Sequence, residues 1–433
     1  MLVLKNGLEL FKPLFVKSVS ASAVSTRRKV KTEKAPTAKK PQISKQLVEY
    51  LRLQLPSIFG PDSTLKSTKF PSKLVSIGKS TPDSIYLVDE AVANSICSKL
   101  SSENLDVSCP AIEINPGIGL LTKKLVEHFG FHHLTCFQDN NLLSLFAEQQ
   151  KDWTLPPDLK VVPTNYVTFP RLCHLDRFDG GHRIYNHLNQ VRIPEPQTHP
   201  GVTVESRKFP PPLYVFGALP HLAALNFLIK SYVTGTALFE EGYGWSEPIF
   251  YIVIAPRANW ILRATPSTNL FRYRASSVLF QLFFKYQEIE TFPRQSFIPW
   301  QRKLPVEGRR HMRCILRNDF DEQTVHFLKI EVNQETLRVL GRDNLLPFWY
   351  FVRQHLVSRR KPIIVQLESW IPGCGPRLIR EGFTIYTSFG DLTPSEILKV
   401  FLTFISWPEF PNCSFLNAMD KYQAKAEAAE DEE

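Results

Sequence analysis

The stretch that decides the fold is Ala111-Ile112-Glu113-Ile114-Asn115-Pro116-Gly117-Ile118-Gly119-Leu120-Leu121-Thr122. A short apolar run comes first, two glycines one residue apart follow, and a helical pattern of apolar residues continues to position 129. This order predicts a strand, a tight turn and the start of a helix. Glycine tolerates positive φ and lets a ligand approach the main chain, while a helix N-terminus offers unpaired N–H groups to ligand oxygens.

The same stretch argues against one class of ligand. The dinucleotide-binding fingerprint has a third glycine three residues after the second, and this chain has Thr122 there. An NAD(P) site is therefore disfavoured. Because a Gly-x-Gly pair also occurs in ordinary strand-to-helix turns, the assignment of the turn depends on the rest of the chain.

Composition predicts a folded chain without membrane spans, disulfide bonds or metal sites. Of the 433 residues 43% are hydrophobic and 12% aromatic, enough for one large core and a smaller domain. We expect no stretch that crosses a bilayer. The seven cysteines are scattered without a Cys-x-x-Cys pair, and the histidines of residues 171–212 lack metal-ligand spacing. Neither a disulfide framework nor a metal site is expected.

The net charge of +10 is concentrated at the N-terminus. Residues 1–45 carry eleven Lys or Arg and two Glu, while residues 420–433 are acidic. The first 45 residues combine leucines, spaced lysines and an acid-free Ser/Ala-rich segment, a composition typical of a mitochondrial presequence and its basic linker. A disordered basic tail is the alternative. Between the ends the chain is only mildly basic, so contact with nucleic acid requires clustered cations.

Two segments resemble the same family. Glu113 to Thr122 resembles the first motif of the class I S-adenosylmethionine-dependent methyltransferases, and more narrowly that of the rRNA adenine dimethyltransferases and the related mitochondrial transcription factor B family. Tyr86 to Ile96 resembles the F-L-x-D-x-x-V-x-x-x-I segment that precedes this motif in the family. The alternation of strand and helix patterns predicts an α/β fold with a mostly parallel sheet. The resemblance implies a doubly wound, class I methyltransferase-like sheet with a small C-terminal helical domain.

The resemblance also implies a pocket for S-adenosylmethionine. Its residues would be Glu113, Asn115, Gly117, Gly119, Gln138 and Asn165. The family has acids where this chain has Gln138 and Asn165, and those acids contact the ribose hydroxyls and the adenine amino group. A neutral amide loses the charge-assisted part of such contacts. We therefore expect a remnant pocket, in which S-adenosylmethionine is a vestigial ligand and is not required.

The segment that would hold the target base departs further from the family. The adenine dimethyltransferases have Asn-Leu-Pro followed by an aromatic residue, and this chain has Ala218-Leu219-Pro220-His221. Alanine has neither donor nor acceptor to orient the target amine, although His221 could still stack on a base. Because methyl transfer depends on that positioning, we expect no catalytic residue here.

The chain divides into four predicted parts. A presequence and basic linker (1–45) precedes a methyltransferase-like domain (46–335) that contains an irregular insertion (171–212). A C-terminal helical domain (336–412) follows, whose end resembles that of fungal mitochondrial transcription factors, and an acidic flexible tail (413–433) closes the chain. Within the helical domain, Thr393 and Glu396 predict a capping box.

Basic residues gather with aromatics in three places. The first contains Arg263, Phe271, Arg272 and Arg274, and the third runs from Trp349 to Lys361. The second, Arg302, Lys303, Arg309 and Arg310, lies in a loop-like stretch and is the preferred patch. Cations on phosphates supply affinity, and exposed aromatics stack on unpaired bases. The alternative for each cluster is a solvated charged face over core aromatics.

The resemblance implies an initiation factor for the single-subunit mitochondrial RNA polymerase in the matrix. Such a factor assists promoter melting and holds the melted strands on a scaffold that has lost catalysis. Its expected partners are the polymerase and promoter DNA, with rRNA as a further candidate, and no membrane. An active mitochondrial rRNA adenine N6-dimethyltransferase is the alternative, and a non-catalytic ribosome-assembly factor is a third.

Overall fold

The structure, a computed structural model, describes residues 76–77, 84–151, 153, 159–191, 210–219, 222–301 and 323–430. Contacts divide the chain into units of residues 1–50 and 51–433, and all described residues belong to the second unit. The predicted presequence lies outside the described residues. So do Pro220 and His221, together with the preferred cationic patch of Arg302, Lys303, Arg309 and Arg310.

Seven strands form one sheet in the order β5-β4-β3-β6-β7-β11-β8. Five neighbouring strands are parallel, and β11 runs antiparallel to both β7 and β8. The strands are β3 (Ala111–Ile114), β4 (Leu134–Phe137), β5 (Lys160–Val162), β6 (Leu213–Leu219), β7 (Pro248–Ile254), β8 (Phe284–Pro293) and β11 (Thr324–Val332). The prediction of a doubly wound, mostly parallel sheet is confirmed.

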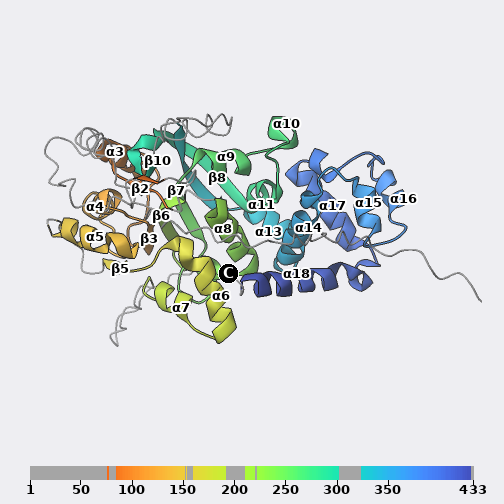
Figure 1. Cartoon of the computed structure of the whole chain (residues 1–433), viewed down its shortest axis with the longest axis horizontal. Helices are drawn as coiled ribbons and strands as arrows, with labels where there is room; N and C mark the ends of the chain where they lie inside the picture. The colour runs from red at the N-terminus through yellow and green to blue at the C-terminus, as the bar shows by residue number, and fades with distance from the viewer. Residues whose placement is uncertain are drawn as a thin grey trace, which may run out of the picture. The chain divides into compact units, whose positions relative to one another are not determined.

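Both faces of the sheet are buried, as its alternating side chains show. In β7, Phe250, Ile252 and Ile254 belong to one hydrophobic core, while Tyr251 and Val253 belong to another. Parallel strands joined by crossover helices require such cover on each face. Figure 1 shows the sheet strands with helices packed around them.

Nine helices accompany the strands of the sheet within the described residues. They are α3 (Glu90–Ser101), α4 (Leu120–Glu127), α5 (Leu143–Gln150), α6 (Phe169–Asp179), α7 (Arg183–Leu188), α8 (Leu222–Thr234), α9 (Pro256–Leu262), α10 (Pro266–Asn269) and α11 (Ala275–Phe283). Two small sheets complete this region: β1 (Ser76–Ile77) with β10 (Trp300–Gln301), and β2 (Tyr86–Leu87) with β9 (Phe297–Ile298).

The C-terminal part is helical, as predicted. Its helices are α13 (Gln334–Leu340), α14 (Leu345–Val357), α15 (Ile363–Glu368), α16 (Gly375–Arg380), α17 (Pro394–Ser406) and α18 (Ser414–Glu430). The capping box is confirmed, since the Thr393 side chain accepts from the backbone N–H of Glu396, whose carboxylate accepts from that of Thr393. The ring centroids of Phe283 and Phe348 lie 5.9 Å apart, so one hydrophobic core continues from the sheet into these helices. The boundary at 335/336 stays a prediction.

Two expectations of irregular structure need correction. The chain from residue 413 was expected to be a flexible tail, but residues 414–430 form α18. Phe415 and Met419 lie one helical turn apart and are buried in the core, which anchors this acidic helix. The insertion 171–212 was expected to be irregular, but α6 and α7 occupy its first part.

One segment was not foreseen from composition. By length and composition, residues 222–239 could cross a membrane, contrary to the expectation that no stretch could. Half of this segment is buried inside the protein, and its first thirteen residues form α8. Leu225 and Leu228 of α8 are fully buried in the core. The segment therefore has the packing of a core helix.

Candidate functional site

The parallel strands bring the predicted pocket residues to one edge of the sheet. β3 lies between β4 and β6, so the chain order reverses at this point of the sheet. Asn115 and Gln138 directly follow β3 and β4, and Asn165 lies three residues beyond β5. Ligands of doubly wound sheets bind at the carboxyl ends of the strands where the order reverses. The tertiary structure therefore brings Asn115, Gln138 and Asn165 to one edge of the sheet, and their role in holding a ligand stays a prediction.

The glycine turn has the predicted backbone. Gly117 and Gly119 have φ of 65° and 83°, and Gly119 caps α4, which begins at Leu120. A Cβ at position 119 would overlap the ring of Trp153 and come within 2.8 Å of Phe146. Position 119 therefore requires glycine both because of its positive φ and because the Trp153 ring packs directly against it.

The structure gives Gln138 a role that the acid found at this position in the family could not fill. Its side chain is fully buried, and Nε2 donates a hydrogen bond of 2.6 Å to the carbonyl oxygen of Gly117. A carboxylate has no proton to donate to that carbonyl. The amide therefore ties the end of β4 to the glycine turn.

Asn165 uses its side chain in a similar way. Its Oδ1 accepts a hydrogen bond of 3.0 Å from the backbone N–H of Val167, and its Nδ2 donates to Ser84 Oγ at 2.9 Å. These bonds cap the short helical turn after β5 and tie it to residue 84. Both polar groups of Asn165 already have partners within the protein.

Asn115 is the exception in this set. Only 4% of the residue is exposed, and neither Oδ1 nor Nδ2 has a hydrogen-bond partner among the described residues. The Oε1 atom of Gln138 is in the same state. Buried polar atoms are usually satisfied, so these three atoms suit a polar ligand lying along the turn. S-adenosylmethionine therefore fits in part: the turn offers contacts, but the groups of Asn165 are already engaged and Trp153 lies against Gly119.

Glu113 lies beneath the turn in the core between β3 and α4. It is 1% exposed, and the Cys136 thiol donates to its Oε2 across 3.9 Å. Burial raises the pKa of the Glu113 carboxyl to about 7, while the Thr122 and Cys136 side chains oppose the rise. Its role in the structure is therefore that of a buried, titratable core group.

The end of β6 contains a glycine that sequence reasoning missed. Gly217 pairs with Ile114 across β3 and β6 and has φ of 129°. A Cβ there would overlap the carbonyl oxygen of Ile114. A glycine inside the apolar run 213–219 was the available signal for this close approach. The next residues, Ala218 and Leu219, are buried and have no side-chain polar group.

The two described cations predicted to bind nucleic acid lie in an exposed group. We define the Arg272 patch as Trp260, Phe271, Arg272, Arg274 and Arg359. The guanidinium of Arg272 lies 4.3 Å from the Trp260 ring centroid, and Phe271 is 77% exposed. Arg359 donates to the carbonyl oxygens of Phe271, at 3.2 Å, and Tyr273, at 2.6 Å. Residues from the first and third sequence clusters therefore meet in one place.

The remaining members of these clusters do not form such a surface. Arg263 binds the Glu288 carboxylate at 2.8 Å. Trp349, Tyr350 and Phe351 are buried in α14, so the hypothesis that they stack on bases is wrong, and the core-aromatic alternative holds for them. Sequence reasoning missed Trp260, which is 39% exposed and lies on α9 shortly after the end of β7.

His, Cys, Asp and Glu side chains, the usual metal ligands, do not gather in groups of three that could hold a metal ion in the part of the chain that the structure describes. The cysteines that fall within the described ranges are all free thiols.

Known proteins resemble the chain in sequence and structure. It is 27% identical over 408 residues to the mitochondrial dimethyladenosine transferase 2 of Drosophila melanogaster, covering 85% of this chain and 86% of that protein. A dimethyladenosine transferase from Plasmodium falciparum aligns over 74% of this chain and 97% of its own, with 13% identity and a TM-score of 0.44. A phosphoethanolamine N-methyltransferase of Haemonchus contortus, solved with S-adenosylhomocysteine, aligns over 73% and 66%, with 11% identity and a TM-score of 0.26.

The family comparison covers most of the described fold. The family model of the ribosomal RNA adenine dimethylases matches residues 78–405, from the segment before β2 to the end of α17. The match includes the glycine turn and the Arg272 patch. The chain belongs to the ribosomal RNA adenine dimethylase family.

Proposed function

We propose that this protein is a mitochondrial transcription initiation factor. It assists the single-subunit mitochondrial RNA polymerase in melting promoters and stabilises the open complex, on a methyltransferase scaffold that has lost catalysis. Its location would be the mitochondrial matrix. The composition of residues 1–45 and the name of the Drosophila relative, a mitochondrial protein, support a mitochondrial location. A scaffold retained apart from its chemistry is a common route to a new function.

The hydrogen bond from Gln138 to the Gly117 carbonyl is the observation that carries the proposal. It commits to the protein interior the amide nitrogen of a side chain at the position where the resemblance implies an acid that contacts the ribose of the methyl donor. Asn165 is committed in the same way, and Ala218 has no group to orient a target amine. At these three positions the side chains stabilise or fill the fold and do not provide the contacts that would bind the methyl donor and orient the target base.

The Arg272 patch supports the nucleic-acid part of the proposal. Melted DNA presents phosphates and unstacked bases, which bind cations and aromatic faces, respectively. In the patch the Arg272 guanidinium lies over the Trp260 ring, Arg359 donates to the backbone carbonyl of Phe271, and the Phe271 ring itself is exposed. The α9 helix that carries Trp260 begins at the carboxyl end of β7, which lies on the same edge of the parallel sheet as the carboxyl end of β3.

An active rRNA adenine dimethyltransferase is the second candidate. The unsatisfied side-chain atoms of Asn115 favour it, because they offer polar contacts to a ligand at the turn. S-adenosylmethionine would then be a required donor, held by the turn backbone, by Asn115 and by Oε1 of Gln138. Under the first proposal the same ligand binds weakly or not at all, and activity does not need it.

Run-off transcription from mitochondrial promoter DNA tests the proposal, with the polymerase present and this protein added or omitted. We expect promoter-specific transcripts only when the protein is added, without S-adenosylmethionine. The variant Phe271→Ala should lose most of this stimulation, while Lys285→Gln, which alters an exposed ion pair with Glu335, should keep it. Methylation of an adenine-containing rRNA hairpin by the purified protein, without any effect on transcription, would refute the proposal.

A further inference from the structure

The loop that carries Phe271 lies at the outer surface of the protein. Residues 263–274 connect α9 to α11 through the short helix α10, which Figure 1 shows at the periphery, away from the sheet. Phe271 is 77% exposed, and the preceding Leu270 is 42% exposed. Neighbouring exposed apolar side chains rimmed by polar residues mark interaction sites, whereas single ones do not. The loop therefore presents an apolar surface that the fold itself does not use.

The backbone around Phe271 is fixed to the rest of the protein. The Arg272 N–H donates back to the main-chain and side-chain oxygens of Asn269, both at 3.1 Å, which closes the turn that contains Phe271. Tyr273 is fully buried, and its hydroxyl donates at 2.8 Å to a main-chain carbonyl of the helical C-terminal part. Arg359 donates to the carbonyls on both sides of Arg272, at 3.2 and 2.6 Å. The exposed ring thus has a rigid support, so little conformational entropy is lost when it binds a partner.

The cations of this surface are available to an anion. Four of them lie within three positions of Phe271 in the chain or directly after Arg359: Arg272, Arg274, Arg360 and Lys361. None of the four forms an ion pair with a carboxylate of the described residues, and all but Arg272 are fully exposed. Glu396, an acid near the buried Tyr273 hydroxyl, instead accepts the hydrogen bonds of the capping box at Thr393. The surface around the loop is therefore positive, which favours a partner with phosphate groups.

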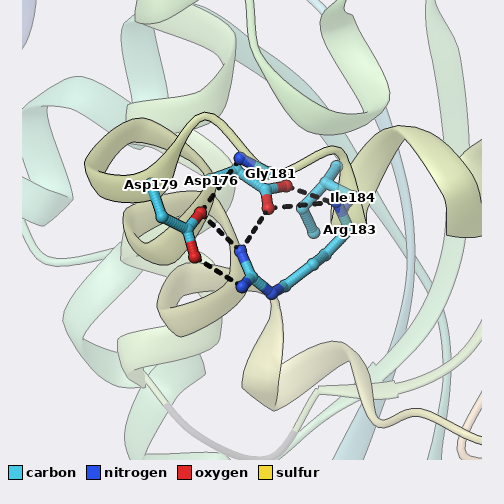
Figure 2. A network of polar contacts seen from close by, with 5 residues as sticks. All are labelled: Asp176, Asp179, Gly181, Arg183 and Ile184. Carbon is cyan, nitrogen blue, oxygen red and sulfur yellow. Dashed lines mark hydrogen bonds and ion pairs between the residues drawn. The ribbon is translucent and has the colours of Figure 1, made fainter.

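A second exposed phenylalanine has different surroundings. Phe178 on α6 is 75% exposed, but the adjacent Asp179 pairs with the Arg183 guanidinium at 2.6 Å. Asp176 accepts from the same guanidinium and from the backbone N–H groups of Arg183 and Ile184, as Figure 2 shows. Two carboxylates thus neutralise Arg183 and hold the turn between α6 and α7. Phe178 is therefore a matched control for Phe271, since the ring is as exposed but the arginine of its turn is engaged.

The Arg272 patch offers one stacking position and not a row of them. Trp260 is 39% exposed, and the Arg272 guanidinium lies over its ring at 4.3 Å from the centroid. The Phe271 ring has no such cover. Proteins that bind continuous single strands stack successive bases on several aromatic side chains, whereas a single apolar side chain at a base step acts as a wedge in a duplex. Where two strands separate, the last base pair has one open face, which a single ring can cover.

We infer that the Arg272 patch binds the junction between duplex and melted DNA, with the Phe271 ring on the open face of the last base pair. The cations around the loop contact the phosphates of the duplex and of the separating strands. This inference deepens the proposed function and rests on it, because it names the form of promoter DNA that the patch takes. In this role Phe271 keeps the strands apart at one end of the opened segment.

Binding of a DNA fork tests the inference without the polymerase. Competition against a labelled fork should show at least tenfold weaker binding of a single strand of equal length and of a relaxed closed-circular duplex, which has no ends. Phe271→Ala should reduce this preference below threefold, because stacking on a base contributes about tenfold or more in affinity. Phe271→Trp should keep the preference, and Phe178→Ala should leave it unchanged. Thermal melting of the variants should equal that of the parent chain, since both rings are exposed.

A fluorescent base locates the contact on the fork. We place 2-aminopurine in the last base pair or, as a position control, three pairs further into the duplex. Its fluorescence should change on binding only at the last pair, and Phe271→Ala should abolish the change. An equal change at both positions, or a fork affinity no higher than that of the single strand, would overturn the inference. Tighter binding of the same fork made of RNA would overturn the assignment to DNA.

Run-off transcription separates this inference from the proposed function. On a duplex promoter Phe271→Ala should lose most of the stimulation, and on the same promoter with a mismatched, permanently open start region it should recover to within about threefold of the parent chain. An equal defect on both templates would overturn the inference and leave the proposed function in place. Absence of stimulation by the parent chain would refute the proposed function, while the fork measurements would still decide which DNA the patch binds. A defect of Phe271→Ala on both templates without any binding of the fork would assign the patch to a protein partner instead.

Discussion

The glycine turn and the Arg272 patch hold polar groups under opposite conditions. At the turn, Gln138 and Asn165 are buried and bound to neighbouring parts of the chain. At the patch, the rings of Phe271 and Trp260 and the guanidinium of Arg272 are at least partly exposed to solvent. The first region resembles a family motif closely, but most of its polar groups are engaged within the protein. The second has no motif, but it exposes a cation and aromatic rings, the kinds of group that the proposed contact with nucleic acid requires. In this protein the family motif therefore indicates the fold, while solvent exposure indicates which side chains are free to contact a ligand.

The largest expected effect concerns the buried region around the glycine turn, where β3 and β6 approach each other closely. In Gly217→Ala, the added Cβ overlaps the Ile114 carbonyl and the residue keeps a strained φ. We expect the free energy of unfolding to fall by about 3–5 kcal/mol, from overpacking and backbone strain together. Urea denaturation measures this loss.

Gly130→Ala is the matched control, because Gly130 also has positive φ but nothing lies within 4 Å of the added Cβ. It should cost about 1 kcal/mol, from strain alone. Equal losses in the two variants would show that the close approach of β3 and β6 does not matter.

The buried carboxyl beneath the turn predicts a pH dependence. Glu113 has its pKa raised from 4.5 to about 7 in the folded chain, so the folded state holds its proton more tightly than the unfolded state. The free energy of unfolding should therefore fall as pH rises from 4.5 to 7, by about 3 kcal/mol, and level off above 7. Glu113→Gln should remove this fall, as measured by urea denaturation across the pH range. A parallel curve for the variant would contradict the assignment, and exposed Glu335→Gln serves as the control.

Restoring an acid at the ribose position tests whether the turn depends on an amide. In Gln138→Glu, the carboxylate cannot donate to the Gly117 carbonyl, which is left without this bond. We expect a loss of about 2 kcal/mol in the free energy of unfolding at pH 8, the cost of an unsatisfied buried group. Gln190→Glu, whose side chain bonds to the exposed Asn186 carbonyl, should change stability by less than about 0.5 kcal/mol. An unchanged stability in the Gln138→Glu variant would mean that the amide is dispensable.

Phe271→Ala tests whether the exposed Arg272 patch contacts nucleic acid. Loss of a stacking ring should weaken binding of single-stranded DNA about tenfold, since such contacts contribute about 1–3 kcal/mol per base. Fluorescence anisotropy with a labelled oligonucleotide measures the affinity, and thermal melting should be unchanged because the ring is exposed. Unaltered affinity would remove the patch from the proposed interface.

The smallest expected effect concerns the bond between the two parts of the patch. A single guanidinium nitrogen of Arg359, Nη1, donates to both the Phe271 and Tyr273 carbonyls. Arg359→Lys keeps the charge but replaces this fixed planar donor with an ammonium group on a more flexible stem. We expect about threefold weaker binding of the same oligonucleotide, because segment 271–273 is held less firmly. A loss as large as that of Phe271→Ala would instead indicate that Arg359 contacts the strand directly.

Several features of the fold follow from local sequence. The apolar run before Glu113, the two glycines and the helical pattern beyond them predict β3, the turn and α4, because strand and helix periodicities depend on residues close in the chain. The capping box at Thr393 follows from residues three apart in the same way. The helix α18 was missed, since its acidic composition hid the two anchoring residues, Phe415 and Met419.

The sequence by itself determined the sheet, the turn and the identities of the residues around it. Only the tertiary structure decided which of their polar groups remain available. The bond from Gln138 to Gly117 spans 21 positions, and that from Arg359 to Tyr273 spans 86. Hydrogen-bond partners and burial depend on such distant contacts, and no local pattern encodes them.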